Sequence, residues 1–252
     1  MVNRLQLVTL VALGISSIAN AAHAAGESCM TTSKPNVPTV VELYTSEGCN
    51  SCPPADQWLS QTVAQMRGMK DNNVIPLAFH VDYWDYIGWK DVFAQPSFAQ
   101  RQAALARTGG ASGVYTPQVF VNGKDDRSWT RASGLTSAAP ASVKFNLTSQ
   151  WQGDAVVFSG KLADANSAIR LRYAVTENGL VSAVKAGENR GETLHHDAVV
   201  RAYGNLSADA TGAFTATVRV PREMRRNASQ LYVIAEDARG NAVAAATLAC
   251  TL

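Results

Sequence analysis

The hydrophobic periodicity of this chain changes once, near residue 135, and that change limits the folds open to the sequence. Before it, short apolar runs alternate with stretches in which apolar residues recur at helical spacing. After it, helical periodicity disappears, and apolar and polar residues alternate in one short segment after another, as from Ile169 to Val175. The first pattern is typical of α/β proteins and the second of antiparallel sheets. The sequence therefore predicts two parts of different architecture.

Strands and helices alternate in the first part. Short apolar runs predict strands, and apolar residues at helical spacing predict the helices between them. The expected order is a strand at 40–44, a helix at 55–66, a strand at 74–81, a helix at 98–106 and a strand at 119–121. The turn signal Asn122-Gly123 ends the last strand. This order predicts an α/β domain.

The remaining boundaries follow from composition and pattern. Residues 136–142 are rich in Ser and Ala and contain Pro140, which is typical of a linker. Six or seven alternating segments follow, separated by turns, and this is typical of a β-sandwich. We therefore predict an α/β domain over residues 25–135 and an all-β, sandwich-like domain over 143–252.

The first 24 residues have the pattern of a secretory signal peptide. Arg4 supplies a positive charge, the segment from Leu5 to Ala19 is mostly apolar, and Ala22-His23-Ala24 fits a small-x-small cleavage site. An N-terminal membrane anchor is the alternative, but the apolar run is shorter than the ~20 residues that a spanning helix needs. We expect a periplasmic or secreted protein with no membrane association after signal cleavage.

Charge and glycine pattern bear on partners and cofactors. The net charge is +2 at pH 7, and this near-neutral balance gives no electrostatic case for nucleic-acid binding. No Gly-rich dinucleotide or phosphate loop occurs in the sequence, so we expect no organic cofactor.

The chain has four cysteines, and in an oxidising compartment disulfides are their default state. Cys49 and Cys52 are separated by two residues and pair naturally with each other. Cys29 and Cys250 then remain, close to the two ends of the mature chain. We expect a structural Cys29–Cys250 disulfide that ties these ends together; free thiols, or pairing between chains, are the alternatives.

The segment Cys49-Asn50-Ser51-Cys52 lies between the first predicted strand and the first predicted helix. Unpaired N–H groups and partial positive charge at a helix N-terminus stabilise a thiolate, and so they lower the pKa of a cysteine placed there. We expect Cys49, at the mouth of the helix, to be the exposed attacking thiol. Cys52, further into the helix, is the expected resolving thiol.

The region around the cysteines resembles thioredoxin-like proteins. Val41-Glu42-Leu43-Tyr44 resembles the strand that precedes the cysteines in that superfamily, and Thr116-Pro117 matches its cis-proline. The resemblance implies that the α/β domain over 25–135 is thioredoxin-like. It also implies that Glu42 is a buried carboxylate that assists proton transfer and that Pro117 shapes the substrate groove.

A second resemblance covers nearly the whole mature chain. It rests on Leu43-Tyr44-Thr45-Ser46-Glu47-Gly48-Cys49, Cys52-Pro53-Pro54-Ala55-Asp56, His80-Val81-Asp82-Tyr83-Trp84, Tyr115-Thr116-Pro117-Gln118, and Gly187-Glu188-Asn189-Arg190 running to Leu194-His195-His196-Asp197. These motifs resemble a bacterial secreted family, the domain-of-unknown-function 1223 family, which is assigned to the thioredoxin-like superfamily. The resemblance implies a fold and gives no substrate.

Two further segments carry open interpretations. Aromatic and acidic residues gather after the second strand, from Asp82 to Trp89. They form either a substrate-facing loop beside the thiols, with Trp84 and Thr116 in the groove, or an insertion packed against the core. The segment from Glu188 to Asp197 is either a loop that reaches the active site from the second domain or a polar turn of the sandwich.

These features together predict a periplasmic thiol–disulfide oxidoreductase. The Cys49 thiolate would attack the disulfide of a protein or small-molecule substrate, and Cys52 would resolve the mixed disulfide. One alternative is a module that binds copper or zinc through the same thiols, with partners such as His80, His195 or His196. Another is a non-catalytic protein that keeps the thioredoxin shape for protein contacts. The direction of the redox chemistry and the oligomeric state stay open.

Overall fold

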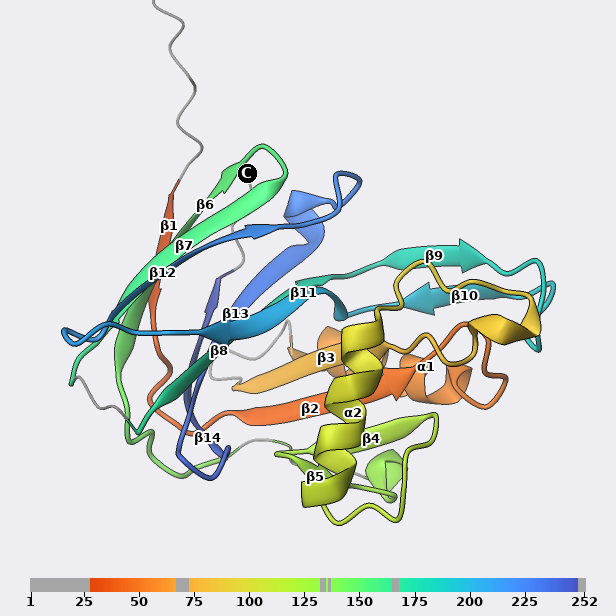
Figure 1. The fold of residues 1–252 in the computed structure, drawn as a ribbon, viewed down its shortest axis with the longest axis horizontal. Helices are drawn as coiled ribbons and strands as arrows, with labels where there is room; N and C mark the ends of the chain where they lie inside the picture. The colour runs from red at the N-terminus through yellow and green to blue at the C-terminus, as the bar shows by residue number, and fades with distance from the viewer. Residues whose placement is uncertain (1–27, 67–72, 132–134, 136, 165–167, 249–252) are drawn as a thin grey trace, which may run out of the picture.

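The computed structural model of this protein describes residues 28–66, 73–131, 135, 137–164 and 168–248. These residues form 14 strands, two α-helices and three short 3-10 helices (Figure 1). The 3-10 helices are η1 (Asp85–Ile87), η2 (Trp129–Arg131) and η3 (Arg226–Ala228).

An eight-stranded sheet with the order β14-β13-β8-β11-β3-β2-β4-β5 runs through the molecule. Its strands are β2 (Thr39–Thr45), β3 (Val74–His80), β4 (Gln118–Val121), β5 (Lys124–Asp125), β8 (Arg170–Glu177), β11 (Val199–Leu206), β13 (Ser229–Glu236) and β14 (Ala242–Leu248). β3 pairs in parallel with both β2 and β11, and the other neighbours are antiparallel. β2 and β3 are buried along their whole length, which explains their continuous apolar runs.

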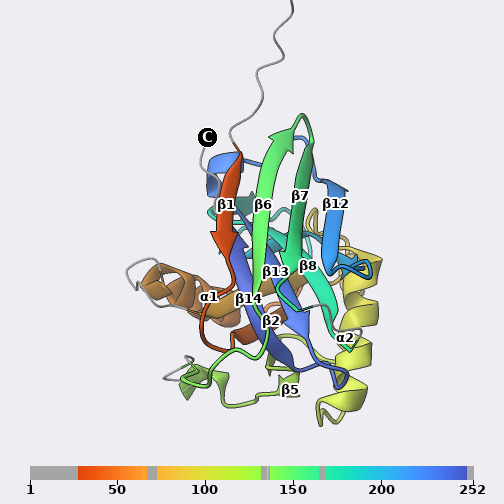
Figure 2. The same ribbon diagram turned by 90° about the vertical axis from the view of Figure 1, so that its left-hand side faces the viewer.

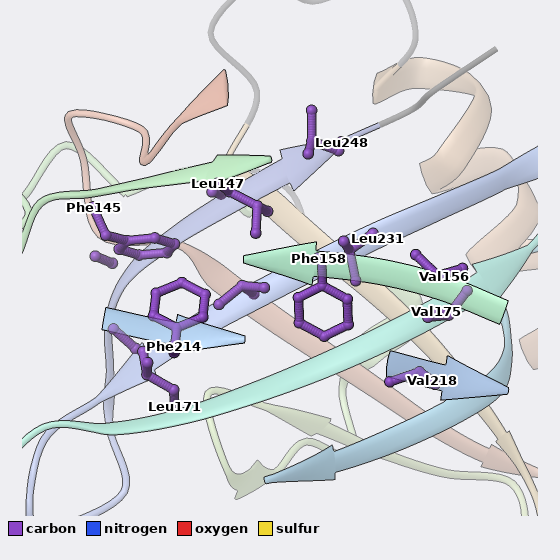
Figure 3. Close-up of a cluster of buried hydrophobic side chains, with 14 of the residues drawn as sticks. Phe145, Leu147, Val156, Phe158, Leu171, Val175, Phe214, Val218, Leu231 and Leu248 are labelled. Atoms are coloured by element: carbon purple, nitrogen blue, oxygen red, sulfur yellow. The ribbon is translucent and has the colours of Figure 1, made fainter. Parts of the chain in front are cut away.

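A second, four-stranded antiparallel sheet has the order β1-β6-β7-β12. Its strands are β1 (Cys29–Thr32), β6 (Phe145–Gln152), β7 (Ala155–Leu162) and β12 (Ala213–Arg219). It stacks on the β8, β13 and β14 end of the larger sheet (Figure 2). Figure 3 shows the core between the sheets, where Phe145, Phe158 and Phe214 meet Leu171, Val175 and Leu231. Alternation of apolar and polar residues along these strands gives this single buried face.

The two helices, α1 (Pro53–Met66) and α2 (Pro96–Thr108), cover opposite faces of β2. Val41 and Leu43 of β2 join the cluster that contains α1 residues, whereas Tyr44 joins the cluster that contains Phe98 of α2. This division follows from the two-residue period of a strand. A separate hairpin, β9 (Leu180–Ala183) with β10 (Thr193–His196), contacts α1 through β10.

The predicted fold class is wrong. The strands and helices predicted before residue 124 are present, but they do not form a separate α/β, thioredoxin-like domain followed by an all-β domain. β3 pairs with β11 through Ala78 and Val199, so strands from both predicted parts build one sheet in a mostly β molecule. β1 also crosses over, since it pairs with β6. Periodicity identifies strands but not their neighbours, and both edges of a parallel strand can accept a partner.

Some predictions fall outside the described residues. These are the signal peptide at 1–24 and Cys250, the expected partner of Cys29, so both stay predictions. Asn36 forms an isolated bridge with Pro140 of the predicted linker. Within the described parts of the chain, no helix is long and apolar enough to cross a membrane.

Candidate redox site

Cys49 and Cys52 form a disulfide in the turn between β2 and α1, with their Cα atoms 5.5 Å apart. Two backbone bonds shape the turn: the Cys49 N–H donates to the Ser46 carbonyl at 3.1 Å, and the Cys52 N–H donates to the Cys49 carbonyl at 3.2 Å. The Cys52 carbonyl then accepts the N–H groups of Ala55 and Asp56, which begins α1. The pair therefore lies at a helix N-terminus, where a thiolate is stabilised.

Both cysteines are fully buried, with exposed fractions of 0%. Asn50 and Ser51 between them are exposed or nearly so, and the Ser51 hydroxyl lies 3.4 Å from Cys49 Sγ. The prediction that Cys49 meets solvent is therefore wrong for the disulfide form. The position of Cys49 just before a helix is consistent with exposure, but a segment from the other half of the chain covers this residue.

That cover is the loop between β9 and β10. The side-chain amide of Asn189 donates to the carbonyls of Glu47 at 2.8 Å and Cys49 at 3.0 Å. The Glu188 carboxylate accepts the N–H of Asn50 at 3.1 Å. Of the two interpretations of this segment, the structure therefore favours a loop that reaches the cysteine turn.

The aromatic segment after β3 packs beside the same turn. A Cβ on Gly48 would lie 3.0 Å from Trp84 Cβ, so only glycine fits there without movement. The Trp84 indole N–H donates to the Thr116 hydroxyl at 2.7 Å, and the Thr116–Pro117 bond is cis, as predicted. Trp84 thus connects the cysteine turn to Thr116, and these two predicted groove residues are in direct contact.

Glu42 does not belong to this site. It lies on the face of β2 that α2 covers, opposite to Val41 and Leu43. Arg101 of α2 donates its Nε to Glu42 Oε2 at 2.7 Å, and the Tyr44 hydroxyl donates to the same oxygen at 2.7 Å. The sheet separates this carboxylate from the first turn of α1, so the proton-transfer role expected for Glu42 conflicts with its position.

Five other titratable side chains are buried around the first turn of α1 and the neighbouring strand ends. This acid–base cluster consists of Glu47, Asp56, His80, Asp91 and His196. Hydrogen bonds hold part of it: Thr45 Oγ1 donates to Asp56 Oδ2 at 3.1 Å, His80 Nδ1 lies 2.7 Å from Asp91 Oδ2, and Trp89 Nε1 donates to Glu47 Oε2 at 2.7 Å. The His80 and His196 rings meet edge to face, with centroids 4.9 Å apart.

The acid–base cluster is not fully satisfied. Among the described residues, Glu47 Oε1, His80 Nε2 and both ring nitrogens of His196 are buried without a hydrogen-bond partner. His196 Nε2 lies 3.3 Å from Glu47 Oε1, which is close enough for an ion pair when the imidazole is protonated. Buried polar atoms are normally paired with protein groups or ordered water, so these atoms mark the cluster as a candidate functional feature.

The surroundings shift the pKa values of three members. Burial is the largest effect on Asp56 and raises its pKa, with partial opposition from His196 and His80. Burial acts to lower the pKa of His80, but the carboxylates of Asp91, Asp56 and Glu47 outweigh it and raise that pKa. Burial acts to raise the pKa of Asp91, but His80 and two backbone N–H groups reverse this and lower it.

The sequence interpretation missed most of this cluster. The sequence offered His80 and His196 as metal partners, or His80 as a structural residue at a strand end, and assigned no role to Glu47, Asp56 or Asp91. The spacing Cys52-x-x-x-Asp56 was one available signal, because it places a carboxylate one helical turn after a thiol. No local pattern marks Asp91, which comes from a loop. Within the described residues, no three His, Cys, Asp or Glu side chains are arranged to hold a metal ion.

Fold and site together define a mostly β protein with a buried C-x-x-C disulfide at a helix N-terminus. Residues 40–236 match the family described as "Protein of unknown function (DUF1223)", and the chain belongs to that family.

Two solved structures are similar to this chain. One is the crystal structure of protein AGR_C_4864 from Agrobacterium tumefaciens, with 26% identity, a TM-score of 0.52, and coverage of 87% of this chain and 97% of the other. The second is HBP35 of Porphyromonas gingivalis, with 17% identity, a TM-score of 0.58, and coverage of 86% and 76%. The second likeness concerns the fold alone. No curated protein matches this chain.

Proposed function

We propose that this protein is a thiol–disulfide oxidoreductase with Cys49 and Cys52 as its redox pair. The supporting observation is the disulfide itself, which lies at the N-terminus of α1 beside the buried acid–base cluster. A disulfide between residues separated by three positions closes a very short loop. In the chain-entropy relation such a loop stabilises a fold by only about 2 kcal/mol, so stability alone is a weak reason for it.

The chemistry needs no cofactor beyond the two sulfurs. In one direction, a substrate thiolate attacks Cys49 Sγ, the Cys49–Cys52 bond breaks, and Cys52 leaves with the electron pair. A second substrate thiolate then attacks the mixed disulfide, releases the Cys49 thiolate and leaves as an oxidised disulfide. In the other direction, Cys49 attacks a substrate disulfide and Cys52 resolves the intermediate. The substrate class is a protein or small-molecule thiol or disulfide.

Substrate access requires a local movement. Asn189 and Glu188 bond the backbone of the cysteine turn, so the loop between β9 and β10 must release it before a substrate reaches Cys49. Thr116 and Pro117, connected to the turn by Trp84, are the proposed groove. The expected signal peptide supports a site of action in the periplasm or outside the cell.

Trapping of mixed disulfides tests the proposal and the roles of the two thiols. With Cys52→Ala, attack by Cys49 is intact and resolution is lost, so covalent complexes with disulfide-containing substrates should accumulate and should dissociate on reduction. Cys49→Ala should trap nothing. Trapping by Cys49→Ala alone would reverse the two roles. If neither variant forms complexes, and wild-type protein does not equilibrate with a glutathione buffer, the proposal is wrong.

A further inference from the structure

The acid–base cluster is larger than the fold requires. Three carboxylates and two imidazoles share an interior in which burial of any one charge is unfavourable unless it is paired. Several of their atoms have no hydrogen-bond partner among the described residues. Such groups gather where protons are moved. The question is which group exchanges a proton with the cysteine pair.

We propose that Asp56, supported by His196 and His80, is the proton-transfer group that protonates and deprotonates Cys52 during disulfide exchange. The inference rests on the proposed redox function and adds to it a proton path that the cysteines alone do not supply.

The position of Asp56 is the first argument. Its backbone N–H donates to the Cys52 carbonyl at 3.2 Å, which closes the first turn of α1. Asp56 follows Cys52 by four positions across the start of α1, so it lies about one helical turn from the cysteine, and both residues are buried. Asp56 is only 7% exposed, and the Thr45 hydroxyl holds one carboxylate oxygen at 3.1 Å.

The chemistry of the buried sulfur is the second argument. When the disulfide is attacked at Cys49, the electron pair of the broken S–S bond stays on Cys52, which has no exposed surface. Full burial disfavours the charged thiolate and opposes its stabilisation by the helix N-terminus, so protonation of Cys52 completes the step. Asp56 supplies the proton: the carboxyl O–H bond breaks, an S–H bond forms on Cys52, and a carboxylate remains. In the reverse direction, that carboxylate removes the proton from the Cys52 thiol before the thiolate attacks the mixed disulfide.

The raised pKa of Asp56 suits this exchange, because it brings the acidity of the carboxyl group closer to that of a thiol. His196 and His80 are the largest favourable charges acting on the Asp56 carboxylate, so they stabilise it after it gives up the proton. The two rings lie 4.9 Å apart and carry unpaired nitrogens, which allows them to return a proton to Asp56.

The other carboxylates nearby are less suited. Glu47 Oε2 is engaged by the Trp89 indole, and Asp91 holds His80 and has a lowered pKa. Glu188 bonds the backbone of Asn50 on the outer side of the turn. Asp85, in the loop after β3, also approaches the cluster, because its carboxylate accepts the Asp91 N–H at 3.1 Å. Asp82 and Lys90 of the same loop act on the pKa of Asp85.

The test measures the rate of disulfide reduction by dithiothreitol between pH 5 and 9 for wild-type protein, Asp56→Asn and His196→Gln. Glu236→Gln is the matched control, because Glu236 is a buried carboxylate paired with Arg172 on a distant strand. Asp56→Asn should slow reduction at least tenfold at neutral pH and remove one ionisation from the profile. His196→Gln should shift the pKa of that ionisation. Glu236→Gln should give the same dependence of the reduction rate on pH as the wild type.

A measurement on wild-type protein covers the case in which Asp56→Asn does not fold. With ¹³C-labelled aspartate carboxyls, one buried carboxyl should titrate above the usual range in the oxidised form and at a different pH after reduction. If wild-type protein exchanges thiols but Asp56→Asn keeps its pH profile, or no aspartate changes on reduction, the inference is wrong and the proposed function stands. If wild-type protein does not exchange thiols at all, the proposed function fails first.

Discussion

The two faces of β2 differ in how fully the buried titratable groups beside them are hydrogen-bonded. On the α2 face, Glu42 receives two hydrogen bonds from Arg101 and one from Tyr44, and the guanidinium also stacks on Tyr203 at 4.6 Å. On the α1 face, the acid–base cluster has more titratable groups, and unpaired atoms remain on three of its side chains among the described residues. A fully paired carboxylate such as Glu42 stabilises the fold, whereas the incompletely paired acid–base cluster is suited to proton transfer.

This contrast corrects the sequence-based choice of the proton-transfer group. Glu42 has the expected burial, but Arg101 and Tyr44 hold its carboxylate by three hydrogen bonds on the α2 face. Asp56 lies on the cysteine side of the sheet and keeps a raised pKa. Burial alone therefore does not identify a functional carboxylate; its face of the sheet and its position relative to the cysteines do.

The largest expected effect comes from removing the ion pair between Arg101 and Glu42 on the α2 face. Arg101→Ala leaves the Glu42 carboxylate buried without its partner, so the free energy of unfolding should fall by about 3–5 kcal/mol. Urea unfolding of the oxidised protein measures this. The double variant Glu42→Leu with Arg101→Leu should recover most of the loss, because no unpaired charge remains. A loss below about 1 kcal/mol for Arg101→Ala would mean that the pair is not structural.

The second effect concerns the disulfide. Cys49→Ser with Cys52→Ser should lower the free energy of unfolding by about 2 kcal/mol relative to the oxidised protein, because the loop that the disulfide closes is short. The same urea experiment, with wild-type protein in oxidised and reduced forms, supplies the comparison. A loss as large as that of Arg101→Ala would make the disulfide a structural staple and would remove the contrast between the two faces.

The third effect is on the cover of the cysteine turn. Asn189→Ala removes two hydrogen bonds to the carbonyls of Glu47 and Cys49. If each contributes about 1 kcal/mol, the loop should open more often and dithiothreitol should reduce the disulfide roughly thirtyfold faster. Glu192→Ala, an exposed position in the same loop, is the control. Equal reduction rates for Asn189→Ala and wild type would show that the loop does not limit access.

Local features of the fold were predictable, and long-range ones were not. The runs that became β2, β3 and β4 and the stripe that became α1 are visible in the sequence, because each depends on a few neighbouring residues. The pairing of β3 with β11 joins Ala78 to Val199 and depends on a match between surfaces far apart in the chain. No periodicity contains that information.

The candidate site divides in the same way. Cys49, Cys52, Trp84 and Thr116 came from motifs in the sequence, and the contact between Trp84 and Thr116 came from the structure. The burial of Cys49 did not, because the covering Asn189 lies 140 positions away. The choice between Glu42 and Asp56 required knowing which face of the sheet each occupies.

The smallest expected effect is a pH dependence of stability on the cysteine side. Asp91, Asp56 and Glu47 raise the pKa of His80 above the ordinary value of 6.5. The folded protein therefore holds this proton more tightly than the unfolded chain does. The stabilisation is fully present below pH 6.5 and is lost as the pH rises through the folded pKa, with a slope no steeper than ~1.4 kcal/mol per pH unit.

His80→Gln isolates this contribution, because it removes the titrating ring and leaves the carboxylates in place. Urea unfolding of the oxidised protein at pH 6, 7 and 8 should show the wild-type free energy of unfolding declining more than that of the variant. The comparison uses the slopes, since the substitution also changes the absolute stability by removing the bond to Asp91. His196 packs against the His80 ring. His196→Gln keeps His80, so its free energy of unfolding should still decline as the pH rises. Parallel slopes for wild type and His80→Gln would mean that His80 does not hold an extra proton, and the contrast between the two faces of β2 would rest on hydrogen bonding alone.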